Sequence, residues 1–316
     1  MKIKNKLQLY KEFGFKVAFS SICSSAFRYP MAITRWKDRC IINWLKKNYS
    51  FIIEDYHKKF SSEIVSENYI PIIWSVWWQG EENAPEIVKT CFANIRRHCG
   101  KKDFRVITKK NFQNYIQLPE YIIKKLDDGI ITLTHLSDIL RFYLLSRYGG
   151  MWIDATIFVA KDIPSEIFEC DYYVIRHEEN FYSYGVNRDR WITYLQAAKK
   201  NSLLCSFGYD FLVEYWKKRN FLIDYMLIDY VVEIAYQEFP KVKNLLDAVP
   251  LNNPEIEGLR PLLNSIFDEK QFQQLKSSTN FFKLTWKHKF EKIISGHETF
   301  YGHLLRGITD FTSCTS

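Results

Sequence analysis

The sequence of 316 residues contains no apolar run long enough to cross a membrane. A membrane-spanning helix needs about 18 or more consecutive apolar residues. The nearest candidate, FGFKVAFSSICSSAF at residues 13–27, is interrupted by Lys16 and four serines. A basic, aromatic-rich segment follows it, which is not the pattern of a secretory signal. We therefore expect neither a transmembrane helix nor a signal sequence here.

Paired cysteines are also lacking. The seven cysteines are scattered along the chain and form neither a CxxC pair nor a His/Cys cluster with the spacing of a zinc site. Cysteines distributed in this way serve as small hydrophobic side chains in a reducing compartment. The sequence therefore predicts a reduced, cytoplasmic protein.

Two phosphate-binding motifs are absent as well. Neither GxGxxG nor GxxxxGK[ST] occurs in the chain, which argues against dinucleotide-dependent dehydrogenases and P-loop NTPases. No recognisable nucleic-acid-binding motif is present, so no nucleic-acid partner is expected. The formal net charge of +8 still favours an anionic partner, either a membrane surface or a phosphorylated substrate.

What the chain does contain is enough apolar sequence for a packed domain. Hydrophobic residues make up 47% and charged residues 25% of it, which argues against wholesale disorder. The order strand, helix, strand over 70–77, 85–99 and 104–108 is the start of a βαβ unit. It predicts an α/β fold with a mainly parallel sheet flanked by helices. Further expected elements are a helix over 133–148, strands over 151–160 and 172–176, a helix-rich stretch over 191–246 and a late strand over 281–286.

Residues 1–68 differ from the rest and predict a basic helical region. Cationic and apolar residues alternate at helical spacing, as where Lys11 and Lys16 flank Phe13 and Phe15. A helix of this kind suits the surface of an anionic membrane. A helical subdomain that packs on the main fold, with solvated lysines, is an equal alternative.

The segment SDILRFYLLSRYGGMWIDAT at residues 137–156 is the most informative part of the chain. Asp138 and Arg141 are three residues apart, so they share one face of a helix. In the strand that follows, Asp154 and Thr156 point to the same side. At the carboxyl edge of an open α/β sheet they would offer oxygen ligands to Mg²⁺ or Mn²⁺, which would offset diphosphate charge as a sugar–phosphate bond breaks. A local ion pair of Asp138 with Arg141, with Asp154 capping a turn, is the alternative.

This segment resembles the donor-binding core of the capsular polysaccharide synthesis glycosyltransferases, which are related to the α-mannosyltransferase and clostridial glucosylating-toxin group. The matching pattern is a Ser-Asp-x-x-Arg helix, then Tyr-Gly-Gly, then a strand with a DxD-type motif. The opening segment IPIIWSVWWQG also resembles the first strand of that family. The resemblance runs from about residue 70 to residue 176 and more faintly to residue 286. It implies a GT-A fold over residues 69–316 and a retaining mechanism.

The resemblance also implies roles for individual residues. By position, Asp138 and Arg141 hold the donor sugar and its phosphates, and Asp154 is the main ligand of the metal. Trp77 stacks on the nucleobase, a uracil, although a structural tryptophan is the alternative. Ala155, beside the metal ligand, is the expected selector of the donor sugar.

Several C-terminal residues are candidates for a further ligand or phosphate contact. They are Lys287, His288, His297 and His303, of which Lys287 is assigned to the donor and His303 to the metal. Lys283 lies in the same FFKLTWKH segment, but a solvated lysine is the commoner explanation for it and for Lys287. Asp229, in a helix expected over 221–236, is predicted at the donor–acceptor junction, with capping or pairing as the alternative.

Thr156 departs from the family pattern, because it stands where the DxD motif has its second acidic residue. A hydroxyl can bind a metal, directly or through water, but it adds no negative charge. We expect weaker metal affinity here, or loss of the dependence on a metal. Mn²⁺ or Mg²⁺ remains the expected cofactor, since a bound diphosphate supplies ligands of its own.

The function implied by the resemblance is transfer of a hexose, galactose or glucose, from a UDP-sugar donor. The implied acceptor is a lipid-diphosphate-linked oligosaccharide of a capsular polysaccharide, extended through an α-linkage at the inner face of a bacterial membrane. Two alternatives stay open. One is a non-catalytic, membrane-associated module that binds nucleotides or glycans, and the other is a sugar-phosphate transferase that releases UMP.

Overall fold

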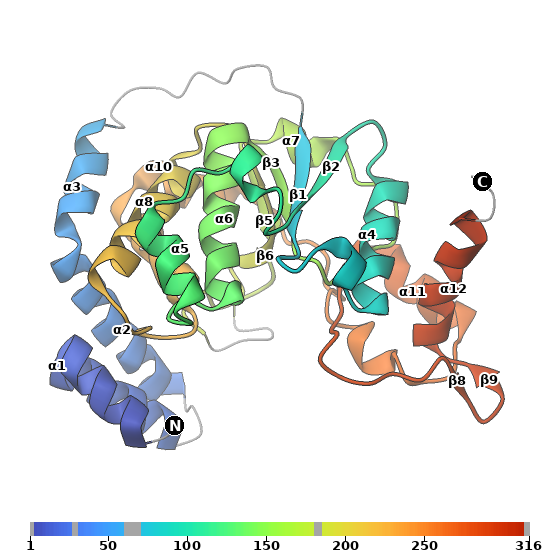
Figure 1. Cartoon of the computed structure of the whole chain (residues 1–316), viewed down its shortest axis with the longest axis horizontal. Coiled ribbons are helices and arrows are strands. Elements are labelled where there is room, and N and C mark those ends of the chain that lie inside the picture. The colour runs from blue at the N-terminus through green and yellow to red at the C-terminus, as the bar shows by residue number, and fades with distance from the viewer. Residues whose placement is uncertain (1–2, 27–30, 60–70, 180–184, 313–316) are drawn as a thin grey trace.

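The computed structural model describes residues 3–26, 31–59, 71–179 and 185–312. A five-stranded sheet lies at its centre, with helices on either side (Figure 1). The strand order is β2-β1-β3-β6-β5, with bounds Asp103–Ile107, Ile72–Val76, Gly150–Ile153, Ile192–Ala198 and Tyr172–Ile175. β1 pairs in parallel with β2 and β3, whereas β6 pairs antiparallel with β3 and β5. All strands except β6 therefore run in one direction, which confirms the mainly parallel sheet.

Alternate residues of the central strands point to opposite faces of the sheet, and both faces are apolar. Trp74 and Trp152 lie in one core, whereas Ile73 and Met151 lie in the other, as the two-residue period of a strand requires. All four side chains are fully buried. The sheet is thus covered on both faces, which is typical of α/β proteins.

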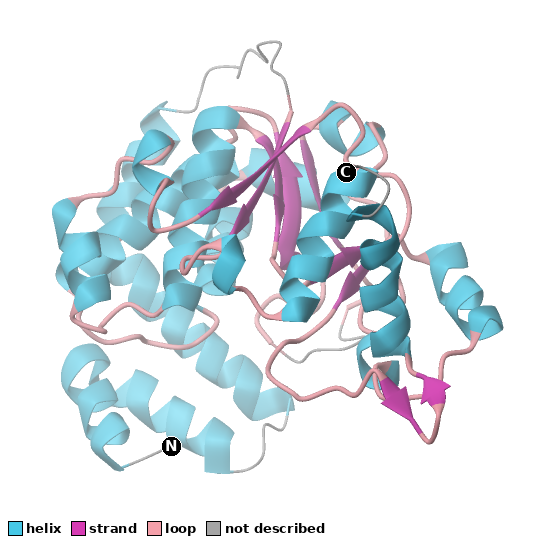
Figure 2. Cartoon of the chain, turned by 45° about the vertical axis from the view of Figure 1, so that its right-hand side comes forward, coloured by secondary structure: helices cyan, strands magenta, loops and turns pink. Residues whose placement is uncertain are grey.

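Two sets of helices provide this cover (Figure 2). The face that bears Trp74 packs against a core that includes α5 (Glu120–Asp127), α6 (Leu133–Tyr148), α8 (Leu203–Lys218), α9 (Leu227–Glu238) and α10 (Pro240–Ala248). The other face shares its core with α4 (Glu86–His98), α7 (Glu166–Glu169), α11 (Glu269–Ser278) and α12 (Phe300–Thr312). A small hairpin of β8 (Ile293–Ile294) and β9 (His297–Glu298) precedes α12.

Helix α6 has the bounds expected from the sequence and leads directly into β3. It ends at Gly149, and both Gly149 and Gly150 have positive φ, at 69° and 96°. A Cβ atom on Gly150 would lie 2.0 Å from the carbonyl oxygen of Ile72 in β1. The glycine pair therefore allows the chain to turn out of the helix and enter the sheet tightly against β1.

The strand expected over 151–160 is two strands, so this prediction is wrong. β3 ends at Ile153, and a turn in which the Ile157 N–H donates to the Asp154 carbonyl oxygen at 3.0 Å leads into β4 (Ile157–Val159). β4 pairs antiparallel with β7 (Phe281–Lys283), outside the central sheet. The chain leaves the central sheet at Asp154 because its next partner is β7.

Two helix predictions also need correction. The helix-rich stretch over 191–246 begins with strand β6, whose residues pair with β3 and β5. The helix expected over 221–236 begins only at Leu227, because Asp224 accepts a hydrogen bond from the Met226 N–H at 3.0 Å and pairs with Lys37 at 2.9 Å. Asp229 consequently lies in the first turn of α9.

Three helices form the N-terminal region, at the end of the molecule opposite α12 (Figure 1). They are α1 (Ile3–Ala26), α2 (Met31–Asn48) and α3 (Ser50–Lys59); residues 60–68 of the predicted region lie outside the described residues. Buried side chains such as Phe13 and Leu45 join the same core as Trp74, so these helices pack on the main fold.

α1 is kinked at Gly14, whose φ is 80°, and apolar side chains are exposed on both of its segments. Leu7, Tyr10, Phe15 and Phe19 are between 46% and 63% exposed, and we call these four residues the N-terminal exposed face. Among the described helices, none has the length and hydrophobicity needed to span a bilayer.

Candidate functional site

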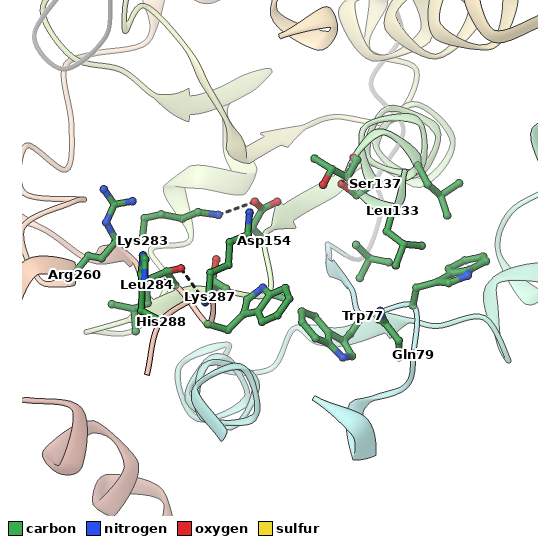
Figure 3. Close-up of a pocket in the computed structure, with 18 of the residues that line it drawn as sticks. Trp77, Gln79, Leu133, Ser137, Asp154, Arg260, Lys283, Leu284, Lys287 and His288 are labelled. Carbon is green, nitrogen blue, oxygen red and sulfur yellow. Dashed lines mark hydrogen bonds and ion pairs between the residues drawn. The ribbon is translucent and has the colours of Figure 1, made fainter. Parts of the chain in front are cut away.

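A cavity of about 640 Å³ opens at the carboxyl ends of β1 and β3 (Figure 3). Its wall is built from residues 76–79 after β1, residues 154–156 after β3, the first turns of α6 and residues 283–288 at the end of β7. Tyr225 and Arg260 complete the lining. In open α/β sheets this edge is the usual place for a ligand.

Asp154 is held by three donors. Its Oδ1 accepts hydrogen bonds from Trp152 Nε1 at 2.9 Å and Arg141 Nη2 at 3.1 Å, and its Oδ2 accepts one from Lys283 Nζ at 2.8 Å. Burial alone raises the pKa of Asp154, but the charges of Lys283 and Arg141 outweigh that effect and lower the pKa below its usual value. The carboxylate is therefore ionised and fixed in the cavity wall.

Asp138 and Arg141 lie behind Asp154 and are not part of the cavity lining. The guanidinium of Arg141 bridges two carboxylates, with Nη1 at 3.4 Å from Asp138 Oδ1 and Nη2 at 3.1 Å from Asp154 Oδ1. Burial raises the pKa of Asp138 to about 7, although Arg141 lowers it. The three residues singled out in the sequence are thus together, but only Asp154 reaches the cavity.

Asp229 is buried next to this group, on α9, and is not part of the cavity lining. Its Oδ1 has no hydrogen-bond partner within the part of the chain that the structure describes. Burial, and then the charge of Asp138, raise the pKa of Asp229 to about 7, against the opposing effect of Arg141. Its place at a donor–acceptor junction stays a prediction.

An aromatic wall stands apart from the charged residues. Figure 3 shows Trp77 with the cavity between it and Lys283. The Trp77 ring meets Trp286 edge to face, with ring centroids 5.8 Å apart. Flat indole surfaces of this kind suit a planar ligand such as a nucleobase.

Cationic side chains dominate the charged part of the wall. Lys283, Lys287 and Arg260 line the cavity, together with His288, against the single carboxylate of Asp154. Arg260 pairs with Glu257 at 3.0 Å. The exposed Lys287 has no ion pair with any described residue. This balance favours an anionic ligand.

Residues 25–304 match the model of a family described as capsular polysaccharide synthesis protein. The chain belongs to this family. Among solved structures, it is similar to the PaToxG glycosyltransferase, at 15% identity and a TM-score of 0.41, over 89% of this chain and 97% of the other. It is also similar to the apo structure of the bifunctional glycosyltransferase WbbM, at 9% identity and a TM-score of 0.41, over 79% of this chain and 51% of the other. Both TM-scores are below 0.5, so these similarities do not decide the activity. No curated protein matches the sequence.

The metal ligands predicted for this member of the capsular polysaccharide synthesis family do not come together. Asp154 and Thr156 line the cavity, but His303 stacks on Phe267, with ring centroids 3.6 Å apart, and lines a different cavity. His297 lies in the β8–β9 hairpin. Within the described ranges there is no group of three or more His, Cys, Asp or Glu side chains that could hold an ion. Without ligands from a bound diphosphate, this donor set does not fit a divalent cation.

From the sequence, a solvated lysine was the expected explanation for Lys283, and Arg260 was not identified as a site residue. The signal for Lys283 was present, because a lysine between the buried residues Phe282 and Leu284 is costly without a partner. Its partner in the structure is the carboxylate of Asp154. Arg260 follows no element or motif that would have indicated its position.

Proposed function

We propose that this member of the capsular polysaccharide synthesis family is a retaining glycosyltransferase. It moves a hexose, galactose or glucose, from a UDP-sugar to a hydroxyl of a lipid-diphosphate-linked oligosaccharide. One observation carries the proposal: the cavity joins the aromatic surface of Trp77 to three cationic side chains, one of which pairs with the carboxylate of Asp154. A nucleoside diphosphate is planar at one end and anionic at the other, so it matches both features.

The donor has a natural orientation in this cavity. Trp77 would stack on the uracil, while Lys283, Lys287 and Arg260 would meet the diphosphate through charge-assisted hydrogen bonds. The volume of about 640 Å³ lies within the range of roughly 300–1,000 Å³ for ligand pockets. Ala155, which follows Asp154 in the wall, is the position that we propose for sugar selection.

In the proposed reaction the bond between the anomeric carbon and the diphosphate oxygen breaks, and its electron pair leaves with UDP. The acceptor oxygen bonds to the same carbon from the same face, and its proton passes to the departing diphosphate. Retaining glycosidases use a second carboxylate about 5–5.5 Å from the first. Of the described residues that line the cavity, only Asp154 has a carboxylate, and donors hold both of its oxygens. The protein therefore acts by positioning and by stabilising charge.

The buried carboxylates have supporting roles in this proposal. Asp138 and Arg141 act as positioning residues, because they reach the donor through Asp154. We assign Asp229, which is buried beside the same group, to the donor–acceptor junction.

We also propose that the protein works at the inner face of the bacterial membrane. The N-terminal exposed face lies on α1 together with the exposed Lys11 and Lys16. Exposed aromatic and cationic side chains on one helix suit a surface of anionic lipids, where a lipid-linked acceptor is available.

Titration calorimetry with UDP tests the proposal. The wild type should bind UDP, and Trp77→Leu should bind at least about tenfold more weakly, since base–aromatic stacking contributes ~1–3 kcal/mol. Trp36→Leu is the matched control, because Trp36 on α2 is also half-buried but does not line the cavity. Failure to bind UDP, with or without Mn²⁺, would overturn the proposal.

Product analysis with UDP-hexose donors separates the alternatives. Hexose transfer releases UDP, whereas release of UMP would reveal a sugar-phosphate transferase. Binding of UDP without turnover of any UDP-hexose would favour the non-catalytic binding module.

A further inference from the structure

We propose that the cavity handles its nucleoside diphosphate without a divalent cation, and that the Lys283 ammonium takes the place beside Asp154 that a metal would occupy. This inference rests on the proposed function and deepens it. It concerns which positive charge offsets the negative charge of the departing diphosphate.

The carboxylate of Asp154 is already neutralised by the protein. Arg141 Nη2 lies 3.1 Å from one oxygen, and Lys283 Nζ lies 2.8 Å from the other. A divalent cation at Asp154 would sit next to two fixed positive charges. Repulsion between like charges at such distances opposes its binding.

Lys283 is held in place by its surroundings. It lies on β7, whose backbone pairs with β4, the strand that begins directly after the turn at Asp154. The Lys283 N–H donates to the Ile256 carbonyl oxygen at 2.7 Å, and its ammonium lies 4.6 Å from the centre of the Tyr194 ring. The Tyr194 carbonyl oxygen in turn accepts the Asp154 N–H at 2.9 Å. One connected set of contacts therefore fixes the ammonium and the carboxylate relative to each other.

Thr156 also supports a cavity that works without a divalent cation. Its carbonyl oxygen accepts the Leu284 N–H at 2.8 Å, which ties the turn to the end of β7. Its side chain is a neutral hydroxyl, so Asp154 is the only acidic residue of the 154–156 turn. With one carboxylate and the cations Lys283, Lys287 and Arg260, the described wall of the cavity already has the net positive charge that a metal would otherwise supply.

For the proposed reaction, the positive charge of the cavity wall needs only to contact the diphosphate leaving group. When the bond from the anomeric carbon to the diphosphate oxygen breaks, the electron pair stays on UDP. The Lys283 ammonium offsets that charge by donating a hydrogen bond to the diphosphate, while its ion pair with Asp154 holds it in place. No co-reactant beyond donor and acceptor is needed.

Calorimetric titration of UDP in excess EDTA and in Mn²⁺ tests the inference on the unaltered protein. We expect the two dissociation constants to agree within about threefold. If UDP binds only when Mn²⁺ is present, the inference is overturned while the proposed function stands. If UDP binds under neither condition, the proposed function itself has failed.

Substitutions assign the effect to Lys283. In EDTA, Lys283→Met should weaken UDP binding about 10- to 100-fold, the range for a lost hydrogen bond to a charged group, and Lys283→Arg should restore most of it. Lys46→Met is the control, since Lys46 is a partly buried lysine that pairs with Glu238 at 2.6 Å, and neither residue lines the cavity. Equal UDP affinity of Lys283→Met and the wild type would overturn the role of Lys283. Lys283→Arg keeps the test valid if the methionine variant does not fold.

Discussion

At the scale of single residues, the site contains buried carboxyl groups whose pKa values shift in opposite directions. Burial raises the pKa of both Asp138 and Asp229 to about 7, whereas the adjacent cations Lys283 and Arg141 overcome burial and lower the pKa of Asp154. The pKa values in one cluster thus differ because Asp154 pairs with both Arg141 and Lys283, whereas Asp138 pairs with Arg141. Perturbed groups of this kind are typical of functional sites.

This difference predicts how stability depends on pH. An aspartate in the unfolded chain has a pKa of about 3.9, so between that pH and about 7 Asp229 binds its proton more tightly in the fold than in the unfolded chain. The free energy of unfolding should therefore fall as pH rises through this window. Asp229→Asn removes the titration, and its loss of stability between pH 5 and pH 7 should be smaller than that of the wild type by on the order of 2 kcal/mol.

Urea unfolding at several pH values measures this slope. Asp127→Asn is the control, because Asp127 is exposed and should leave the slope of the wild type unchanged. Parallel curves for the wild type and Asp229→Asn would show that Asp229 is ionised in the fold.

At the scale of elements, the glycine pair between α6 and β3 positions the site. The glycine pair sets the distance between Asp138 on the helix and Asp154 after the strand, and Arg141 contacts both carboxylates. A side chain at Gly150 would collide with the backbone of β1.

Gly150→Ala should therefore be strongly destabilising. A positive φ and a contact of 2.0 Å to a carbonyl oxygen add backbone strain to steric overlap, each about 1–3 kcal/mol. Gly100→Ala is the matched control, because Gly100 has a φ of +61° but no atom within 4 Å of an added Cβ; it should cost about 1 kcal/mol. Thermal unfolding compares the two, and equal losses would contradict the steric argument.

Elements with strong local signals could be predicted from the sequence. The 133–148 helix is followed by a glycine pair, and its bounds are those of α6. β6 was missed because its pairing partners, Gly150–Ile153 and Tyr172–Ile175, decide its conformation. For the same reason the break at Asp154 could not be foreseen: it depends on β7, far along the chain.

The site was predictable to a similar extent. Asp154, Ala155, Thr156, Trp77 and Lys287 all line the cavity, as their places after strands or near β7 indicated. The contact of Lys283 with Asp154 could not be derived, because it depends on tertiary pairing. His303 was chosen by residue type alone, and it packs against Phe267 instead.

At the scale of the whole molecule, one apolar surface lies far from the cavity. The N-terminal exposed face is on α1, whereas the sheet edge that bears the cavity is at the centre of the molecule (Figure 1). If this face lies on a membrane, the protein has a fixed orientation towards a lipid-linked acceptor.

Vesicle co-sedimentation tests this orientation. The wild type should sediment with vesicles that contain phosphatidylglycerol, less with phosphatidylcholine alone, and less again in high salt. The double substitution Phe15→Ser with Phe19→Ser should weaken binding at least about tenfold, since both rings lose their apolar contact with lipid. Ile293→Ser, an exposed apolar residue on the β8–β9 hairpin, is the control. Equal binding to both lipid compositions would contradict the model of an anionic surface.

The ion pair between Asp154 and Lys283 joins residues that are 129 positions apart in the sequence. During synthesis on the ribosome, the helix with Asp138 and Arg141 and the turn with Asp154 are made well before β7. Until then Asp154 lacks its lysine, and the wall of the cavity formed by residues 283–288 does not exist. An incompletely synthesised chain therefore lacks part of the cavity that we propose for the donor.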